Sequence, residues 1–312
     1  MRTLALLFML LLPVAEAQNI SQSSPAPRPA VPPNVRVLRD LAYVPDGTAR
    51  QKLDLYLPQA PGPARPLVAY IHGGGWKAGS KDHCPAIALV GRGYAVASIE
   101  YRFSQDAIYP AQIEDCKAAI RWLRAHSAEY GIDPQHIGVW GASAGGHLVA
   151  LLGVTGQIKD FDTGANLDQS SAVQCVVDFF GPTDFLHYGE HPDPARDTAS
   201  SSVAQLLGGT IETHEDLARK ASAVYYITKD AAPFLIVHGD HDPLVPLQQS
   251  QELQADLQKA GVSCTLMVVP GGGHGGPGFM TPERQKAGLD FFNRYLKPKG
   301  EAAAVGHPEA RS

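Results

Sequence analysis

The chain has 312 residues, of which 44% are hydrophobic and 18% are charged, and its formal net charge at pH 7 is −5. These proportions are typical of a globular protein and exclude a largely disordered chain. The slightly acidic balance gives no basic surface of the kind that binds nucleic acid, so we expect no nucleic-acid partner.

The first 17 residues are predicted to be a signal peptide. Arg2 gives a positive start, residues 4–12 form an apolar run, and Ala15 and Ala17 fit a small-x-small cleavage site. This run is too short to cross a bilayer, which requires about 20 apolar residues. We therefore expect a secreted or periplasmic protein without a membrane anchor.

The rest of the chain divides into three parts. Residues 18–34 are rich in proline and serine and are predicted to be a linker, and residues 298–312 are predicted to be a flexible tail. Residues 35–297 form the expected folded domain, in which apolar runs alternate with helical patterns. The predicted strands are 52–57, 66–71, 94–99, 136–140, 173–180, 234–237 and 263–269.

Helical patterns occupy the stretches between these strands. The predicted helices include 113–130, which Gly131 ends, 247–257, and one that begins at Thr281 with Pro282 in its first turn. Apolar strands that alternate with helices indicate a single α/β domain around a parallel sheet that is covered on both faces.

A candidate nucleophile lies between the strand 136–140 and the helical residues 147–152. Gly141, Ser143 and Gly145 form a G-x-S-x-G sequence at this strand-to-helix junction. A sharp turn exposes the serine hydroxyl, and the flanking glycines leave room for a tight backbone. Ser143 is therefore predicted to be catalytic, although glycine and serine also occur in ordinary turns.

A glycine-rich loop follows the strand 66–71. It reads His72-Gly-Gly-Gly-Trp76, and its backbone N–H groups are suited to binding an oxyanion together with the N–H group of Ala144. A phosphate-binding loop is the alternative, but Lys77 does not stand where a P-loop requires its lysine. His72 is expected to orient the loop rather than act as a base.

The remaining members of a catalytic triad are expected in the two loops after 234–237 and 263–269. Asp242 is the candidate that orients the base, and Asp240 is a competing candidate whose alternative role is to cap the turn. His274 lies in a glycine-rich loop and is the candidate base. The order Ser, Asp, His is the order found in α/β-hydrolases.

Two further patterns bear on metals and disulfides. His187 to His191 matches a zinc-peptidase pattern, but Gly189 and Pro192 disfavour the helix that such a site needs, so we expect a lid loop, no metal and no cofactor. The four cysteines, Cys84, Cys116, Cys175 and Cys264, are too few for a disulfide scaffold. Whether Cys84 pairs with Cys116 is left open.

Taken together, the segments HGGGW, GASAGGH, HGDHDPLVP and GGGHG resemble the α/β-hydrolase superfamily, and most closely its acetyl-esterase and feruloyl-esterase branch, related to hormone-sensitive-lipase-like carboxylesterases. The resemblance implies a mostly parallel eight-stranded sheet with helices on both faces. It also implies Ser143, Asp242 and His274 as the catalytic residues and Gly73, Gly74 and Ala144 as the oxyanion donors. Trp76, at the end of the HGGGW segment, is predicted to bind substrate.

The chain departs from hormone-sensitive-lipase relatives in one respect. Only 54 residues separate the predicted cleavage site from His72, which leaves no room for a large N-terminal cap. The region of about 185–232 is the remaining place for a small lid, so we expect an open site that suits bulky, hydrophilic esters.

The sequence therefore predicts a secreted serine carboxylesterase that acts on small esters or polysaccharide esters through an acyl-enzyme, with acetyl or feruloyl groups as the leading substrates. Two alternatives remain at this point. One is a peptidase or amidase with the same triad, and the other is a catalytically silent hydrolase fold that serves as a binding module.

Overall fold

The computed structural model describes residue 28 and residues 30–188 and 198–297. The predicted signal peptide, most of the predicted linker and the predicted tail lie outside these residues, as do Glu190 and His191 of the zinc-like pattern. Among the described helices, none combines the length and the apolar character that a bilayer crossing requires.

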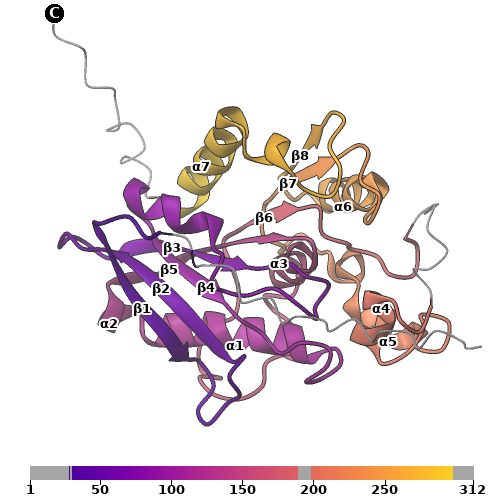
Figure 1. Ribbon diagram of the computed structural model, residues 1–312, viewed down its shortest axis with the longest axis horizontal. Coiled ribbons are helices and arrows are strands. Elements are labelled where there is room, and N and C mark those ends of the chain that lie inside the picture. Colours follow the sequence, from indigo (N-terminus) through magenta and orange to yellow (C-terminus); the bar gives the residue numbers. More distant parts are fainter. Residues whose placement is uncertain (1–27, 29, 189–197, 298–312) are drawn as a thin grey trace, which may run out of the picture.

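Eight strands form one sheet in the order β1-β2-β4-β3-β5-β6-β7-β8 (Figure 1). β2 pairs antiparallel with both β1 and β4, and every other pair is parallel. This confirms the predicted mostly parallel eight-stranded sheet. The strands are β1 (Val35–Ala42), β2 (Lys52–Pro58), β3 (Arg65–Ile71), β4 (Ala95–Ile99), β5 (Ile132–Ala142), β6 (Cys175–Phe179), β7 (Phe234–Gly239) and β8 (Cys264–Val269).

β1 was missing from the strands identified by sequence pattern. It is an edge strand, mostly half-buried or exposed, and its register shifts between Leu38 and Leu41. Within that irregularity Asp40 has a φ of 56°. A charged, irregular edge strand lacks the continuous apolar run that marks a buried strand.

Helices cover both faces of the sheet, as predicted (Figure 1). One face packs against α1 (Ala111–Ala125), α3 (Ala144–Val154) and α6 (Leu247–Lys259), and the other against η1 (Pro85–Arg92) and α7 (Pro282–Leu296). The single helix expected over 113–130 is two helices, α1 and α2 (Ser127–Tyr130), which meet at His126. Gly131 ends α2 with a φ of 65°, and the Thr281 side chain caps α7, both as expected.

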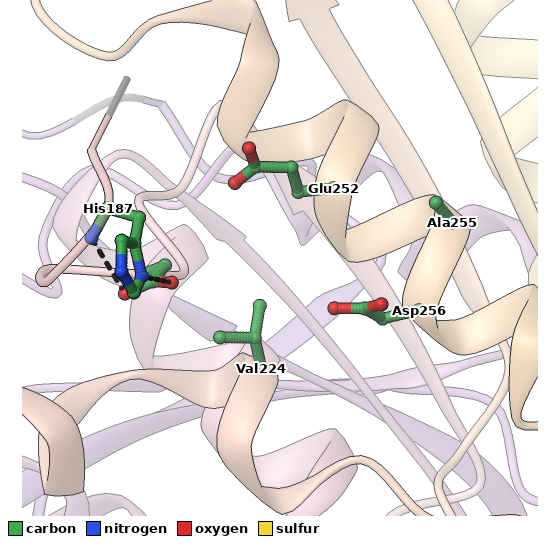
Figure 2. Close-up of a pocket in the computed structure, with 6 residues that line it drawn as sticks. His187, Val224, Glu252, Ala255 and Asp256 are labelled. Carbon is green, nitrogen blue, oxygen red and sulfur yellow. Dashed lines mark hydrogen bonds and ion pairs between the residues drawn. The ribbon is translucent and has the colours of Figure 1, made fainter.

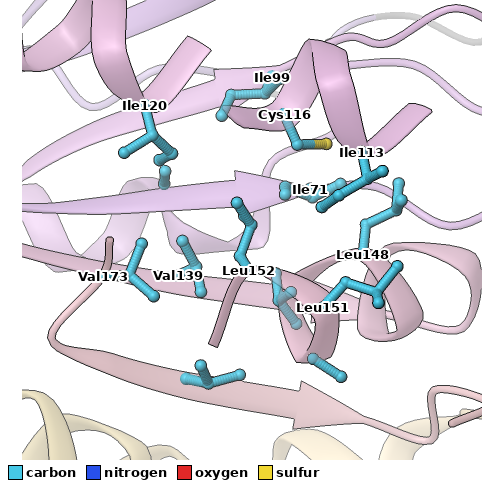
Figure 3. Packing of buried hydrophobic residues seen from close by; sticks show 14 of the residues in the cluster. Ile71, Ile99, Ile113, Cys116, Ile120, Val139, Leu148, Leu151, Leu152 and Val173 are labelled. Atoms are coloured by element: carbon cyan, nitrogen blue, oxygen red, sulfur yellow. The ribbon is translucent and has the colours of Figure 1, made fainter. Parts of the chain in front are cut away.

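The alternating direction of side chains along a strand divides the core into two layers. In β3, Leu67, Ala69 and Ile71 join the layer under α1 and α3, whereas Val68 and Tyr70 join the layer under η1 and α7. Figure 3 shows the first layer, where Ile71 and Val139 of the sheet lie beside Leu148, Leu151 and Leu152 of α3 and Ile113, Cys116 and Ile120 of α1. The inner strands are therefore fixed from both sides.

An insertion between β6 and β7 corresponds to the predicted small lid region. Its described part contains α4 (Ser202–Leu207), α5 (Glu215–Ala221) and η3 (Ala223–Tyr226). The α4 end reaches the glycine-rich loop, because a Cβ built on Gly75 would lie 2.9 Å from Ser202 Oγ. The insertion thus contacts the loop that follows β3.

Candidate active site

The candidate residues all follow strands that are parallel neighbours. The glycine-rich loop follows β3, Ser143 follows β5, Asp242 follows β7 and His274 follows β8. Because the carboxyl ends of parallel strands lie at one edge of a sheet, these loops converge there.

Ser143 occupies a tight strand-to-helix turn. Its φ of 56° and ψ of −121° are unfavourable for a residue with a side chain. Two backbone hydrogen bonds hold it there: the Ser143 N–H donates to the Phe179 carbonyl at 2.8 Å, and the Ser143 carbonyl accepts from the His147 N–H at 3.0 Å. The turn points the hydroxyl away from the helix and toward the loops at the edge of the sheet.

Close backbone approaches explain two of the glycines beside the serine. A Cβ built on Gly145 would lie 2.0 Å from the Ile71 carbonyl oxygen, and one built on Gly73 would lie 2.7 Å from the Ala142 carbonyl oxygen. Both distances are too short for a side chain. The glycines therefore let the turn and the glycine-rich loop pack directly against each other.

Ser143, His274 and Asp242 form a continuous chain of hydrogen bonds. His274 Nε2 lies 2.7 Å from Ser143 Oγ, and His274 Nδ1 lies 2.7 Å from Asp242 Oδ2. With the Nδ1 proton donated to the carboxylate, Nε2 is free to accept the serine proton. The three residues predicted as nucleophile, base and orienting acid are thus brought together in the required order.

Asp242 is fixed by several donors. Its side chain is fully buried, and Oδ1 accepts from the N–H groups of Leu244 and Val245 at 2.8 and 2.9 Å. Burial alone would raise the pKa of this carboxyl, but hydrogen bonds from His238, His274 and Val245 outweigh burial and hold the pKa well below its usual range. Asp242 therefore stays ionised and keeps its orientation toward His274.

Asp240, the competing candidate, faces elsewhere. Its Oδ1 accepts from His241 Nδ1 at 2.7 Å and from the Gly271 N–H at 2.6 Å. These contacts connect the loops after β7 and β8. His241 is mostly exposed and belongs to this surface pair.

The glycine-rich loop places its first residues beside the nucleophile. The Cβ that Gly73 lacks would lie 3.2 Å from Ser143 Cβ, and Ala144 begins α3. Within the described residues, no backbone or side-chain acceptor pairs with the N–H groups of Gly73, Gly74 or Ala144. All three predicted oxyanion donors are therefore free to bind an added oxygen.

His72 orients this loop, as expected, and does not face the serine. Its Nδ1 lies 2.7 Å from the Gly73 carbonyl oxygen, its Nε2 lies 3.4 Å from Glu100 Oε1, and its ring stacks on Tyr101. The Tyr101 hydroxyl also donates to the His72 carbonyl at 3.0 Å. These contacts fix the start of the glycine-rich loop against the residues that follow β4.

The structure corrects the role predicted for Trp76. It was predicted to bind substrate, but its side chain is only 3% exposed and its indole N–H donates to His147 Nδ1 at 3.1 Å. The ring packs edge-on against His147 and Phe185. A residue so enclosed offers no face to a substrate, so Trp76 supports the loop from within the core.

Two residues near the triad carried no clear signal in the sequence. His238 is fully buried, its Nε2 lies 2.8 Å from the Val245 carbonyl oxygen and 3.4 Å from Asp242 Oδ2, and its Nδ1 lies 2.6 Å from Ser250 Oγ. The Phe180 ring lies 4.6 Å from the His274 ring, centroid to centroid. His238 lies in β7, one residue before the strand ends at Gly239, and its place just before the acid loop was the one sequence signal for its role.

A cavity of about 280 Å³ lies apart from the triad. Asp184, His187, Val224, Glu252, Ala255 and Asp256 line it, between the insertion and α6 (Figure 2). Asp184 is occupied within the chain, because its carboxylate accepts from the backbone N–H groups of Leu186 and His187 and pairs with the His187 ring at 3.1 Å. The residues that line the cavity therefore do not include any member of the Ser143–His274–Asp242 chain.

The described residues form neither a metal site nor a disulfide. Over 30–188 and 198–297, no group of three or more His, Cys, Asp or Glu side chains is arranged to hold a metal ion. All four cysteines are free and buried, so Cys84 and Cys116 are not paired. Burial raises the pKa of the Cys84 thiol to about 12, which keeps it protonated and unreactive.

The sheet order, the strained serine after β5 and the Ser–His–Asp chain define an α/β-hydrolase. Within that class the chain belongs to the BD-FAE family, whose match covers residues 53–257. It is 31% identical to Esterase LipC of Mycobacterium tuberculosis over 279 residues, which are 84% of this chain and 67% of LipC. The chain spans about half the length of the next curated relatives, 45% and 53%. The chain is thus a member of a family of carboxylic ester hydrolases.

Solved structures agree with this assignment. A truncated carbohydrate esterase from gut microbiota superposes with a TM-score of 0.77 at 36% identity, over 84% of this chain and 97% of that chain. A bifunctional GH43-CE protein from Bacteroides eggerthii superposes with a TM-score of 0.76 at 34% identity, over 83% of this chain and 35% of that chain.

Proposed function

We propose that this chain is a serine carboxylesterase that removes short acyl or hydroxycinnamoyl groups, such as acetyl or feruloyl, from polysaccharides. The observation that carries the proposal is the chain of two 2.7 Å hydrogen bonds from Ser143 through His274 to Asp242, at the edge of the sheet where ligands bind. No metal or cofactor takes part in the proposed reaction.

In the first half of the reaction, Ser143 Oγ attacks the ester carbonyl carbon while His274 Nε2 takes its proton. Asp242 stabilises the imidazolium that forms, and the N–H groups of Gly73, Gly74 and Ala144 bind the negatively charged oxygen. The tetrahedral intermediate collapses as His274 returns the proton to the departing alcohol oxygen. The acyl group remains on Ser143.

In the second half, water attacks the acyl-enzyme and His274 takes one of its protons. The second tetrahedral intermediate uses the same oxyanion donors. Its collapse releases the carboxylic acid, and His274 returns the proton to Ser143 Oγ. Each turnover consumes one ester and one water and yields one alcohol and one acid.

The polysaccharide substrate is supported by the similarity to a carbohydrate esterase at 36% identity over nearly the full length of that protein. The chain also has only a small insertion over the sheet edge, in which α4, with 6 residues, and α5, with 7, are short. A small insertion favours a site that a polymer chain can approach.

A substrate panel tests this proposal. The panel contains acetylated xylan, feruloylated arabinoxylan and p-nitrophenyl esters of increasing acyl length. We expect release of acetate or ferulate from a polysaccharide and a preference for short acyl chains among the synthetic esters. A preference for long acyl chains with no release from either polysaccharide would rule out the proposed substrate class. Aminoacyl amides, assayed beside the esters, identify an amidase if they react at comparable rates.

The serine mechanism predicts that Ser143→Ala abolishes turnover. The variant removes the nucleophile but leaves the oxyanion donors, so kcat should fall by about 10⁵- to 10⁶-fold with the fold intact. Purified variant and wild type are assayed on p-nitrophenyl acetate and compared by circular dichroism. Stoichiometric labelling by a fluorophosphonate in the wild type alone identifies Ser143 as the reacting residue. Wild-type activity in the variant would refute the mechanism, whereas inactivity of the wild type itself would support the catalytically silent alternative.

We also propose that the protein acts outside the cytoplasm. The positive start at Arg2, the apolar run over 4–12 and the Ala15-Glu16-Ala17 sequence support export. N-terminal sequencing of protein recovered from the periplasm or medium should begin at Gln18. Recovery of the full-length chain in the cytoplasm alone would contradict this proposal.

A further inference from the structure

His147 is a buried histidine that the proposed mechanism does not use. It lies one turn after Ser143 on α3, and its side chain is fully buried. Its Nδ1 lies 3.1 Å from Trp76 Nε1, and its Nε2 lies 2.7 Å from the Ala221 carbonyl oxygen. One imidazole thus joins the nucleophile helix, the glycine-rich loop and the insertion.

The two partners determine where the ring carries its proton. An indole N–H only donates and a carbonyl only accepts, so His147 Nδ1 is unprotonated and Nε2 carries the hydrogen. Burial lowers the pKa of His147 to about 4, against the opposing effect of the Ala221 hydrogen bond. The ring is therefore neutral at ordinary pH and serves as a fixed acceptor on one side and a fixed donor on the other.

The loop that His147 holds is strained at Trp76. Gly74 and Gly75 adopt φ values of 115° and 58° at little steric cost, because they have no Cβ, whereas the φ of 57° at Trp76 costs a residue with a side chain about 1–2 kcal/mol. At Trp76 the backbone carbonyl accepts from the Ser104 N–H at 2.8 Å and the indole is held by His147. Tethers of this kind are what keep a strained conformation populated.

The insertion is attached to the same point. Ala221 is the last residue of α5, and the Phe185 ring packs against both His147 and Trp76, at 5.1 and 5.8 Å between centroids. The Phe185 N–H donates to Ser222 Oγ at 2.9 Å, which joins the start of the insertion to the residue that follows α5. His147 is thus one of the contacts that join the insertion to the glycine-rich loop, together with Phe185 on Trp76 and Ser202 beside Gly75.

We propose that His147 is a positioning residue that sets the geometry of the oxyanion hole. By holding Trp76 against α3, it keeps the N–H groups of Gly73 and Gly74 in register with that of Ala144, which begins the same helix. These donors act most strongly on the tetrahedral intermediate, so a displaced loop weakens transition-state binding more than substrate binding. The inference rests on the proposed esterase function of the same site.

Trp76→Phe is the most selective test, because it removes the indole N–H and keeps an aromatic ring in the core. On p-nitrophenyl acetate we expect kcat to fall by about 10- to 100-fold, which is less than the 10²- to 10³-fold cost of losing an oxyanion donor, while KM stays within about twofold. The inhibition constant of phenylboronic acid, which forms a tetrahedral adduct with the active serine, should rise in parallel with the loss in kcat.

Two substitutions of His147 separate its roles. His147→Phe removes both hydrogen bonds and should lower kcat at least as far as Trp76→Phe does. His147→Asn places an amide oxygen near the position of Nδ1, so it keeps an acceptor for Trp76 and should recover part of the lost kcat. The matched control is Trp122→Phe. Trp122 is a second buried tryptophan, lies in α1 and stacks on His126, and the kcat of this variant should equal that of the wild type.

Thermal melting and fluorophosphonate titration of each variant report the folded, active fraction. A wild-type kcat and boronate affinity in both Trp76→Phe and His147→Phe would overturn the proposal. So would losses that follow only the decrease in active fraction, since these indicate a purely structural role. Failure of the esterase mechanism itself is recognised separately, by activity that persists in Ser143→Ala.

Discussion

The two sides of the active site are built differently. The nucleophile side follows β3 and β5, whose inner residues are buried on both faces of the sheet, and its turn packs against the glycine-rich loop without side chains between them. The acid–base side follows β7 and β8. β8 is an edge strand, and Val268 in β8 and Leu244 beside the acid are 39% and 56% exposed.

This difference matches what each side must do. The oxyanion donors are backbone groups, so they are positioned only if the backbone itself is held, and close packing does this on the nucleophile side. On the acid–base side the acting groups are side chains. Asp242 is fixed by hydrogen bonds to its carboxylate, and this leaves the surrounding loop free to be exposed. The nucleophile side therefore depends on packing, and the acid–base side depends on hydrogen bonds.

The largest effect is expected from Asp242→Asn on the acid–base side. The amide N–H₂ group would face His274 Nδ1, so the ring would carry its proton on Nε2 and could not accept the proton of Ser143. We expect kcat to fall by about 10⁴-fold with little change in thermal stability. Asp240→Asn is the matched control, because Asp240 is exposed and contacts His241 and Gly271 instead, and its kcat should stay near that of the wild type. Equal losses in both variants would mean that the triad does not depend on a single carboxylate.

Packing on the nucleophile side is tested by Gly145→Ala. The added Cβ would lie 2.0 Å from the Ile71 carbonyl oxygen, so the turn and β3 must separate. We therefore expect the free energy of unfolding to fall by about 3 kcal/mol and the activity to be lower. Gly288→Ala in α7 is the control, since its Cβ would meet nothing within 4 Å. That variant should gain about 0.5–1 kcal/mol. Urea unfolding measures both free energies. An unchanged free energy of unfolding in Gly145→Ala would contradict the inference that the turn packs tightly against β3.

A smaller effect is expected at Asp178, on β6 between the two sides. This carboxyl is fully buried, Oδ1 accepts from the Gly181 N–H, and Oδ2 has no hydrogen-bond partner among the residues that the structure describes. Burial raises the pKa of Asp178 from 3.8 to about 6. Because the folded pKa lies above the unfolded one, the stability associated with this group is full below about pH 4 and is lost as the pH rises toward 6.

Asp178→Asn removes this loss, because the side chain stays neutral at every pH. When the pH is raised from 4 to 8, the free energy of unfolding of the variant should rise by about 1–3 kcal/mol relative to that of the wild type. Urea unfolding of both proteins at the two pH values gives this difference. The contributions of the other titrating groups cancel, because both proteins contain them. A stability difference that is the same at pH 4 and pH 8 would show that Asp178 keeps its ordinary pKa.

Most of the fold was predictable, because its strands are continuous apolar runs and its turns carry glycine and proline. β1 escaped prediction because an irregular edge strand has no apolar run. The candidate triad was predictable from the order of Ser143, Asp242 and His274 along the chain. By contrast, Trp76 was predicted to bind substrate, and only the folded structure showed that its side chain is buried and bonded to His147.

By itself, the sequence determined the α/β class of the domain, the strand-to-helix turn at Ser143 and the short set of candidate residues, because these depend on local pattern and on residue type. The tertiary structure decided between Asp242 and Asp240, which are two residues apart and chemically identical. It also placed His238 beside Asp242, and His147 between Trp76 and the Ala221 carbonyl group. Such choices depend on which carboxylate or ring meets a partner from another strand or helix, and the distances between segments far apart in the chain exist only after folding.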